Sequence, residues 1–187
     1  MRRMWFVMIV GLILSSLLGC APPAGDGSST QLDSLFSRLR ATDNADEARH
    51  IEMAILRVWV HSGQADVDAL MLHGLQLVNA GELDGAMPVF DRVIALAPGF
   101  AEAYDQRAQL HLLRQEYSEA VADIQHVLVL EPRHFGALVG LGHILELYGQ
   151  DEMALRSYNQ ALAINPHLDA VREQADSLRQ KLRGVSI

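Results

Sequence analysis

The sequence contains only one cysteine, Cys20, and only one lysine, Lys181. A single cysteine excludes an internal disulfide. The formal charge is −8, because 15 Lys and Arg residues stand against 23 Asp and Glu residues. Nucleic-acid binding depends on basic side chains that neutralise phosphates, so this balance argues against a protein that binds DNA or RNA.

Motifs for catalysis and metal binding are also missing. The sequence has no Gly-x-Ser-x-Gly elbow, no Walker loop and no carboxylate pair in a plausible rigid setting. It has eight histidines, but no His-x3-His spacing, no His-Glu-x-x-His motif and no Cys/His cluster. His61, His126 and His134 fall near predicted helix surfaces or turns, where a solvated histidine is ordinary. We therefore expect no enzyme activity, no cofactor, no metal ion and no small-molecule substrate.

The first 20 residues have the pattern of a targeting segment. Two arginines precede a stretch at 5–18 that is apolar apart from two serines. At about 1.5 Å per residue this stretch spans roughly 21 Å as a helix, short of the ~30 Å hydrocarbon core of a membrane. It ends in Leu-Leu-Gly-Cys at 17–20, which resembles the bacterial lipobox.

The lipobox resemblance implies cleavage of a signal peptide (1–20) before Cys20 and attachment of lipid to this cysteine. The mature protein would then be a lipoprotein of the cell envelope, held at a membrane by its lipid anchor. By the same resemblance, Ala21 favours the outer membrane, with the protein facing the periplasm. The alternatives are a plain secretory signal or an uncleaved anchor, which would give a periplasmic protein or one anchored in the inner membrane.

A short helical region is expected to follow the targeting segment. Residues 21–30 are rich in Pro, Gly and Ser and are predicted to form a flexible tether. Apolar residues at helical spacing predict one helix over 31–41 and another over 45–62. We expect the region 31–66 to be an N-terminal cap that covers the open end of the repeats described next. Alternatively, these helices fold back into a groove or form a dimer face around Trp59.

A unit of 34 residues repeats three times, at 67–100, 101–134 and 135–168. Small residues recur at positions 8 and 20 of each unit, and a proline recurs at position 32. Small residues at a helix crossing allow two helices to pack closely, and a proline cannot continue a helix. The recurring residues are Gly74, Ala108 and Gly142 at position 8, Ala86, Ala120 and Ala154 at position 20, and Pro98, Pro132 and Pro166 at position 32.

This pattern resembles the tetratricopeptide repeat (TPR) family, in which each unit is a pair of antiparallel helices. The resemblance implies an all-α fold, a TPR α-solenoid of three helix-turn-helix repeats, because one hairpin cannot bury its apolar face alone. Residues 169–187 continue with a helical period and are expected to form a C-terminal capping helix. The middle unit departs from the pattern, with Arg107 and His111 where leucine-like residues are usual.

In TPR proteins the first helix of each unit lines a concave groove, chiefly through positions 2, 5, 9, 12 and 13. These positions here are apolar with acidic edges, which suits an apolar or basic helix or extended segment of a partner protein. Chaperone adaptors of the family clamp a terminal carboxylate, but Met71 and Leu75 occupy clamp positions, so we do not expect that specificity. Part of this stripe could instead be core, or be covered by the N-terminal helices. The candidate groove residues are Met71, Leu75, Val78, Glu102, Asp105, Gln109, Leu112, Leu113, Val139, His143 and Leu147.

The sequence therefore predicts a non-enzymatic adaptor, tethered by lipid in a bacterial envelope, that presents a groove to another protein. Similar TPR lipoproteins serve the assembly of envelope complexes. Two alternatives are a structural envelope protein that associates with itself and an accessory subunit of an envelope hydrolase.

Overall fold

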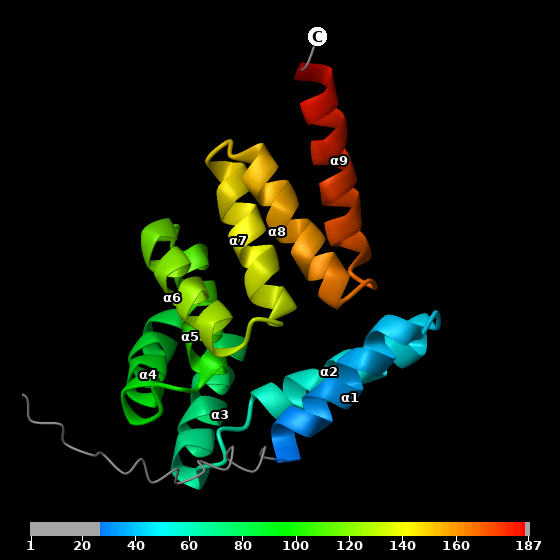
Figure 1. Cartoon of the computed structure of the whole chain (residues 1–187). Coiled ribbons are helices and arrows are strands. Elements are labelled where there is room, and N and C mark those ends of the chain that lie inside the picture. Colours follow the sequence, from blue (N-terminus) through cyan, green and yellow to red (C-terminus); the bar gives the residue numbers. More distant parts are fainter. Residues whose placement is uncertain (1–26, 186–187) are drawn as a thin grey trace, which may run out of the picture.

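The computed structural model describes residues 27–185, and the regular elements in that range are all α-helices (Figure 1). The predicted all-α class is confirmed. Cys20 and the rest of the targeting segment lie outside the described residues. Between residues 27 and 185, no helix is long and apolar enough to cross a membrane. The helices are α1 (Gly27–Ala41), α2 (Ala45–Trp59), α3 (Ala65–Asn79), α4 (Leu83–Leu96), α5 (Ala101–Leu113), α6 (Tyr117–Leu130), α7 (Phe135–Leu147), α8 (Asp151–Ile164) and α9 (Asp169–Val185).

The first helix begins earlier than predicted. The tether was expected to extend to residue 30, but α1 begins at Gly27. Ser and Thr are common at helix N-termini, so the polar stretch that resembles a linker also supplies the first helical turn. Asn44 then caps α2, because its side chain accepts hydrogen bonds from the backbone N–H groups of Asp46 (2.9 Å) and Glu47 (3.0 Å).

Helices α3 to α8 form three antiparallel pairs that stack on one another (Figure 1). Each pair turns through a residue with a left-handed backbone at the same position of the unit. These residues are Gly81 (φ 78°), Gln115 (φ 60°) and Gly149 (φ 68°). Glycine adopts this conformation without steric cost, so Gln115 is the strained member of the series.

The small residue at position 8 of a unit faces the large residue at position 24. A Cβ atom added to Gly74 would lie 2.6 Å from Cε1 of Phe90, and one added to Gly142 would lie 2.3 Å from Cε1 of Tyr158. The middle unit has alanine at position 8 and a smaller partner, isoleucine, at position 24. The side chains at positions 8 and 24 are therefore complementary in size: the larger one is, the smaller the other. The three pairs are Gly74 with Phe90, Ala108 with Ile124, and Gly142 with Tyr158, and all six residues are buried.

Arg107 replaces an apolar contact by an ion-pair network. Its Nε and Nη2 donate to the two oxygens of Asp123 on α6 at 2.8 and 2.6 Å. Its Nη1 donates to Asp91 on α4 at 2.7 Å, so the guanidinium links the first two units. Hydrogen bonding to Asp123 is the main cause that raises the pKa of Arg107. The other departure from the pattern, His111, contacts Glu116 at 2.6 Å.

Helices α1 and α2 form a hairpin that lies across one edge of the array, where α6 and α8 end and α7 begins (Figure 1). Trp59 is 8% exposed and contacts Phe36, Phe135 and the imidazole of His134. The buried residues of the shared cluster are Leu32, Leu35, Phe36, Leu39, Ala48, Ile51, Ile55 and Trp59 from the hairpin, and Phe135, Leu138 and Ala161 from the third unit.

This placement corrects the prediction that residues 31–66 cover the open end of the first unit. The apolar stripe of α2 packs against Phe135 and Leu138, while Val60, just beyond α2, joins the cluster of the first unit. A sequence pattern identifies such a stripe but not which of several apolar surfaces receives it. Trp59 is 8% exposed, so this side chain is not available at the surface for the dimer face proposed around it.

Polar contacts from two turns between helices fix the hairpin in place. Asn165, which is fully buried, joins the hairpin through its amide. Each contact joins a group on a turn between helices of the array to a group on the hairpin. Hydrogen bonds are directional, so these contacts determine how the hairpin is oriented on the array. The contacts are Asn165 Nδ2 to Glu52 Oε1 (2.7 Å), His167 Nε2 to the carbonyl of Leu39 (3.0 Å) and Arg133 Nη1 to Asp33 Oδ1 (2.6 Å).

The last helix, α9, packs against α8. Its apolar residues Val171, Ala175 and Leu178 are buried in a cluster with Ala154 and Tyr158 of the third unit. The opposite side of α9 carries charged residues, so this helix gives the last unit a polar outer surface.

We expect Gly74→Ala to destabilise the protein, because the new methyl group would overlap the ring of Phe90. Overpacking costs about 1–3 kcal/mol, which exceeds the gain of up to about 1 kcal/mol from replacing a helical glycine. Phe90→Ile should relieve the overlap, so the double variant should lose less stability than the sum of the single variants. Urea denaturation of the three variants measures this coupling. If the changes in the free energy of unfolding were strictly additive, the side chains at positions 8 and 24 would not be coupled in size.

Candidate interaction groove and a buried ionisable cluster

The residues predicted to line a groove differ widely in exposure. Leu113 and Leu147, at position 13 of adjacent units, are 64% and 66% exposed. The three most buried residues belong to the core or to the cluster described below. Exposure divides the set as follows: Met71, Glu102 and Asp105 are buried; Leu75, Val78, Leu112 and Val139 are half-buried; Gln109, Leu113, His143 and Leu147 are exposed.

A hollow of about 200 Å³ between α5 and α7 brings five of these residues together. Its walls combine aliphatic side chains with a carboxylate, an amide and an imidazole. Two glycines of α7 also lie in its wall, where they leave room between the helices. The residues from the predicted set are Asp105, Gln109, Leu112, Val139 and His143, and the glycines are Gly136 and Gly140.

The acidic rim expected at this groove is only partly present. Glu102 and Asp105 are each 6% exposed, so neither offers a charge to an approaching partner. Both lie beside His134, on which Trp59 of the hairpin is stacked. Met71 is 1% exposed and belongs to the core of the first unit. Position in the repeat placed these residues on the correct helices, but the hairpin and the neighbouring unit decided their burial.

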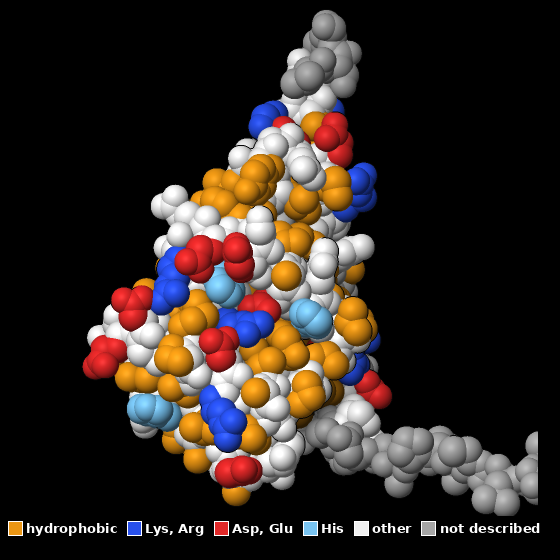
Figure 2. All heavy atoms as spheres, turned by 90° about the vertical axis from the view of Figure 1, so that its left-hand side faces the viewer, with side chains coloured by type: hydrophobic (Ala, Val, Ile, Leu, Met, Phe, Trp, Pro, Cys, Tyr) orange, Lys and Arg blue, Asp and Glu red, His pale blue; other side chains and the backbone are white. Residues whose placement is uncertain are grey.

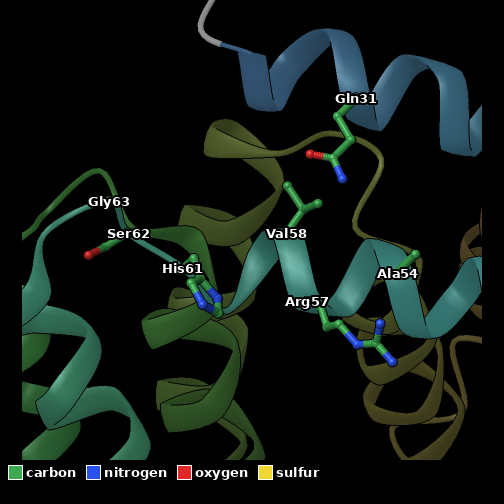
Figure 3. A pocket seen from close by; sticks show the side chains of 7 residues that line it. All are labelled: Gln31, Ala54, Arg57, Val58, His61, Ser62 and Gly63. Atoms are coloured by element: carbon green, nitrogen blue, oxygen red, sulfur yellow. The ribbon is translucent and has the colours of Figure 1, made fainter.

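Other hollows lie outside this groove. One of about 640 Å³ lies beside the hairpin and is lined by Gln31 of α1, residues 54, 57 and 58 of α2, and residues 61–63 (Figure 3). Another of about 730 Å³ lies between α6, α7 and α8, with Tyr117 and Tyr148 among its lining residues. Figure 2 shows the face that lies on the left in Figure 1, where hydrophobic side chains form several patches separated by charged groups.

Two carboxylates and one imidazole form a buried cluster at the junction of α5 and α7. Nε2 of His134 lies 3.4 Å from Oε2 of Glu102, and Nδ1 lies 3.6 Å from Oδ1 of Asp105. The backbone N–H of Ala137 donates to Nδ1 at 3.1 Å, so His134 also caps the start of α7. The indole of Trp59 stacks on the imidazole, with ring centroids 4.2 Å apart.

The cluster attracts positive charge. Burial raises the pKa of Asp105, and the charge of Glu102 raises it further, against the opposing effects of His134 and Gln109. Burial alone would lower the pKa of His134. The hydrogen bond to Glu102 and the charges of Asp105, Glu102 and Glu131 outweigh that effect, so the pKa of His134 is raised.

The prediction that His134 is a solvated histidine near a helix surface or turn is wrong, because its exposed fraction is 3%. A signal was present in the repeat itself. Residues separated by nearly one period of 34 lie side by side in adjacent units, and His134 follows Glu102 by 32 residues. The stacking of Trp59 on this cluster has no such signal, because the hairpin lies outside the repeats.

We expect Asp105→Asn to stabilise the protein at neutral pH, because it removes a buried charge that faces a second carboxylate. The amide oxygen of asparagine can still accept the hydrogen bond that Gln109 donates to Asp105. The matched variant Asp123→Asn should be destabilising by about 1–3 kcal/mol or more, because it weakens the buried pair with Arg107. Chemical denaturation in buffer with EDTA compares the two. Equal destabilisation would contradict this view of the cluster.

Comparison with known proteins agrees with the repeat architecture. The family model described as tetratricopeptide repeat matches residues 135–168, the third unit. A TPR repeat-containing protein of Rhizobium etli is 35% identical over 161 residues, which cover 86% of this chain and 79% of that protein. Tetratricopeptide repeat protein 36 of Danio rerio is 33% identical over 113 residues, which cover 58% of this chain and 59% of that protein.

Solved structures share the fold at low sequence identity. The first TPR domain of Spaghetti (RPAP3), bound to an HSP90 peptide, has a TM-score of 0.59 at 17% identity, covering 63% of this chain and 93% of that chain. The crystal structure of MamA protein has a TM-score of 0.57 at 18% identity, covering 82% of this chain and 81% of that chain. Together with the relative from Rhizobium etli, these findings show that the chain belongs to the tetratricopeptide repeat family, which supports a role as an adaptor in protein–protein interaction.

Proposed function

We propose that the protein is a non-enzymatic adaptor that holds a segment of a partner protein along the first helices of its second and third units. The observation that carries this proposal is the exposure of Leu113 and Leu147. They occupy the same position in adjacent units and are 64% and 66% exposed. Exposed apolar groups that recur on one side of an array are typical of an interaction site.

The chemistry of the groove favours a partner segment with apolar side chains. The hollow between α5 and α7 supplies Leu112 and Val139 as apolar contacts, and Gln109 and His143 as hydrogen-bonding groups. Because Glu102 and Asp105 are buried, electrostatic attraction of a basic partner is a smaller part of the proposal than the sequence suggested. Peptides bound to other TPR domains, such as the HSP90 peptide on Spaghetti (RPAP3), are precedents for segment binding.

We also propose that the protein works in a bacterial envelope as a lipoprotein, where it contributes to the assembly of a complex. The support is the lipobox-like sequence at 17–20, which ends in the one cysteine of the chain. Two acyl chains are needed for stable anchoring, and this is what a diacylglyceryl group supplies.

The groove can be tested by photo-crosslinking in the membranes of the native cells. A photoreactive residue at Leu113 should capture a defined partner, and the same residue at Val129, which is 80% exposed on α6, should not. Adding Leu147→Asp should reduce capture at least about tenfold, because a lost leucine contact is worth about 1.5–3 kcal/mol. Circular dichroism checks that each variant remains folded. Equal capture from both positions, or full capture in the folded Leu147→Asp variant, would exclude this groove.

The anchor is tested separately with Cys20→Ala. We expect the wild-type protein to sediment with membranes and to enter detergent, and the variant to lose lipid and remain unprocessed. Metabolic labelling with a palmitate analogue, followed by cell fractionation, measures both effects. Recovery of mature, unlabelled wild-type protein free in the periplasm would contradict lipid anchoring without affecting the groove.

A further inference from the structure

The buried cluster of Glu102, Asp105 and His134 has an unbalanced charge. Its two carboxylates have no Arg or Lys partner within the described part of the chain. Arg133, the neighbour of His134 in sequence, is paired instead with Asp33 and Glu131. Buried charges are costly unless a group of opposite charge lies beside them, so this cluster requires either protons or a cation.

A second cluster in the same protein shows the usual solution. Asp123 is also buried, and His111 Nε2 lies 3.8 Å from one of its oxygens. There, however, Arg107 binds the carboxylate through two hydrogen bonds and supplies the missing positive charge. The cluster at the junction of α5 and α7 has the same kinds of acidic and imidazole groups without the arginine.

The geometry of this cluster suits a metal ion. One donor atom from each of Glu102, Asp105 and His134 lies within 4.8 Å of the other two, and this is the one such group in the region 27–185. Nε2 of His134 faces Glu102 Oε2 at 3.4 Å and is the nitrogen that would hold an ion. Binding there requires the imidazole proton on Nδ1, so the contact of Nδ1 with the N–H of Ala137 would be given up when the ion binds. Two ligands bound tetrahedrally at about 2.0–2.2 Å lie about 3.3–3.6 Å apart, so this pair needs almost no movement.

Groups around the three donors hold them in position. Nε2 of Gln106 donates to the other oxygen of Glu102 at 2.9 Å, and Nε2 of Gln109 donates to Oδ2 of Asp105 at 2.6 Å. Outer contacts of this kind orient metal ligands and are needed for high affinity.

One member of the cluster, Asp105, reaches the neighbouring hollow. Asp105 and Gly136 both line the space of about 200 Å³ between α5 and α7. A Cβ atom added to Gly136 would lie 3.5 Å from the imidazole of His134, so the glycine keeps this side of the ring open. The hollow is large enough for an ion to enter and for a water molecule to complete its coordination. The indole N–H of Trp59, which stacks on His134, has no acceptor among the described residues.

We propose that Glu102, Asp105 and His134 bind a divalent transition-metal ion, with Zn²⁺ as the best fit. One imidazole and two carboxylates match the ligands of zinc, with water in the fourth position. The ion would join α5 to the start of α7 and, through the stacked Trp59, would strengthen the contact between the N-terminal hairpin and the array. The proposal requires neither the lipid anchor nor a bound partner segment, although Asp105 also lines the hollow assigned to the interaction groove.

The test is a zinc titration of the full chain in detergent, after removal of metals with EDTA and exchange into metal-free buffer. The sequence has two tryptophans, and Trp5 lies in the proposed signal peptide. Trp59 is therefore the one indole of the processed chain, and Trp5→Phe makes it so in the unprocessed full chain. We expect saturable binding of one Zn²⁺ per chain, a change in Trp59 fluorescence and a higher Tm, with no response to Mg²⁺. Glu102→Gln and Asp105→Asn should each weaken binding about 10–100-fold, and His134→Asn should abolish it.

The matched control is His111→Asn, which alters the second cluster and should leave zinc affinity unchanged. Asparagine at 134 can still cap α7, so circular dichroism should show His134→Asn to be folded. Glu102→Gln removes a buried charge and keeps the acceptor for Gln106, which gives a second folded variant. Absence of saturable binding in the wild type, or wild-type zinc affinity in Glu102→Gln and Asp105→Asn, would overturn the proposal.

Discussion

The close approach of the two helices within each repeat is the constraint on which the rest of the structure depends. It requires a small residue at position 8 wherever position 24 is aromatic, as Gly74 with Phe90 and Gly142 with Tyr158 demonstrate. The alanines at position 20 are completely buried at the same crossings. With this spacing fixed, each hairpin presents a flat apolar side that only a neighbouring hairpin can cover, so stacking follows.

The stacked array leaves one edge apolar, and the N-terminal hairpin uses it. Phe135 and Leu138 at the start of α7 receive the stripe of α2, and Trp59 is enclosed there. Burial of this tryptophan removes the most prominent candidate for a self-association surface. It leaves Leu113 and Leu147 exposed on the first helices of units two and three, where a partner can reach them. The hairpin therefore covers part of the apolar surface of the array and leaves another part open to a partner.

The buried carboxylates at the junctions between units have two different kinds of partner. In the middle unit, Arg107 neutralises Asp123 and Asp91 and so connects α4, α5 and α6. At the junction of α5 and α7, Glu102 and Asp105 share one imidazole, and burial raises the pKa of Asp105. The first arrangement is complete within the protein. The second is balanced only with additional positive charge, which is why it is a candidate for a bound ion.

The sequence by itself determined the repeat. Its period, its small residues and its prolines are local features, because helix formation, helix crossing and helix termination each depend on residues within one unit. The same frame placed the candidate groove residues on the first helix of each pair. Even Arg107 and His111 stood out as exceptions before their partners were known.

Only the tertiary structure decided where the hairpin packs, which groove residues are buried and that Trp59 closes over the cluster of Glu102, Asp105 and His134. An amphipathic stripe such as that of α2 requires an apolar partner but does not specify which one, since several surfaces of the array are apolar. Burial of Asp105 and exposure of Leu147 likewise depend on neighbours that are distant in sequence. Contacts between the hairpin and the array join residues that are distant in sequence. The pattern of apolar residues along the chain does not show which part of the array the hairpin covers.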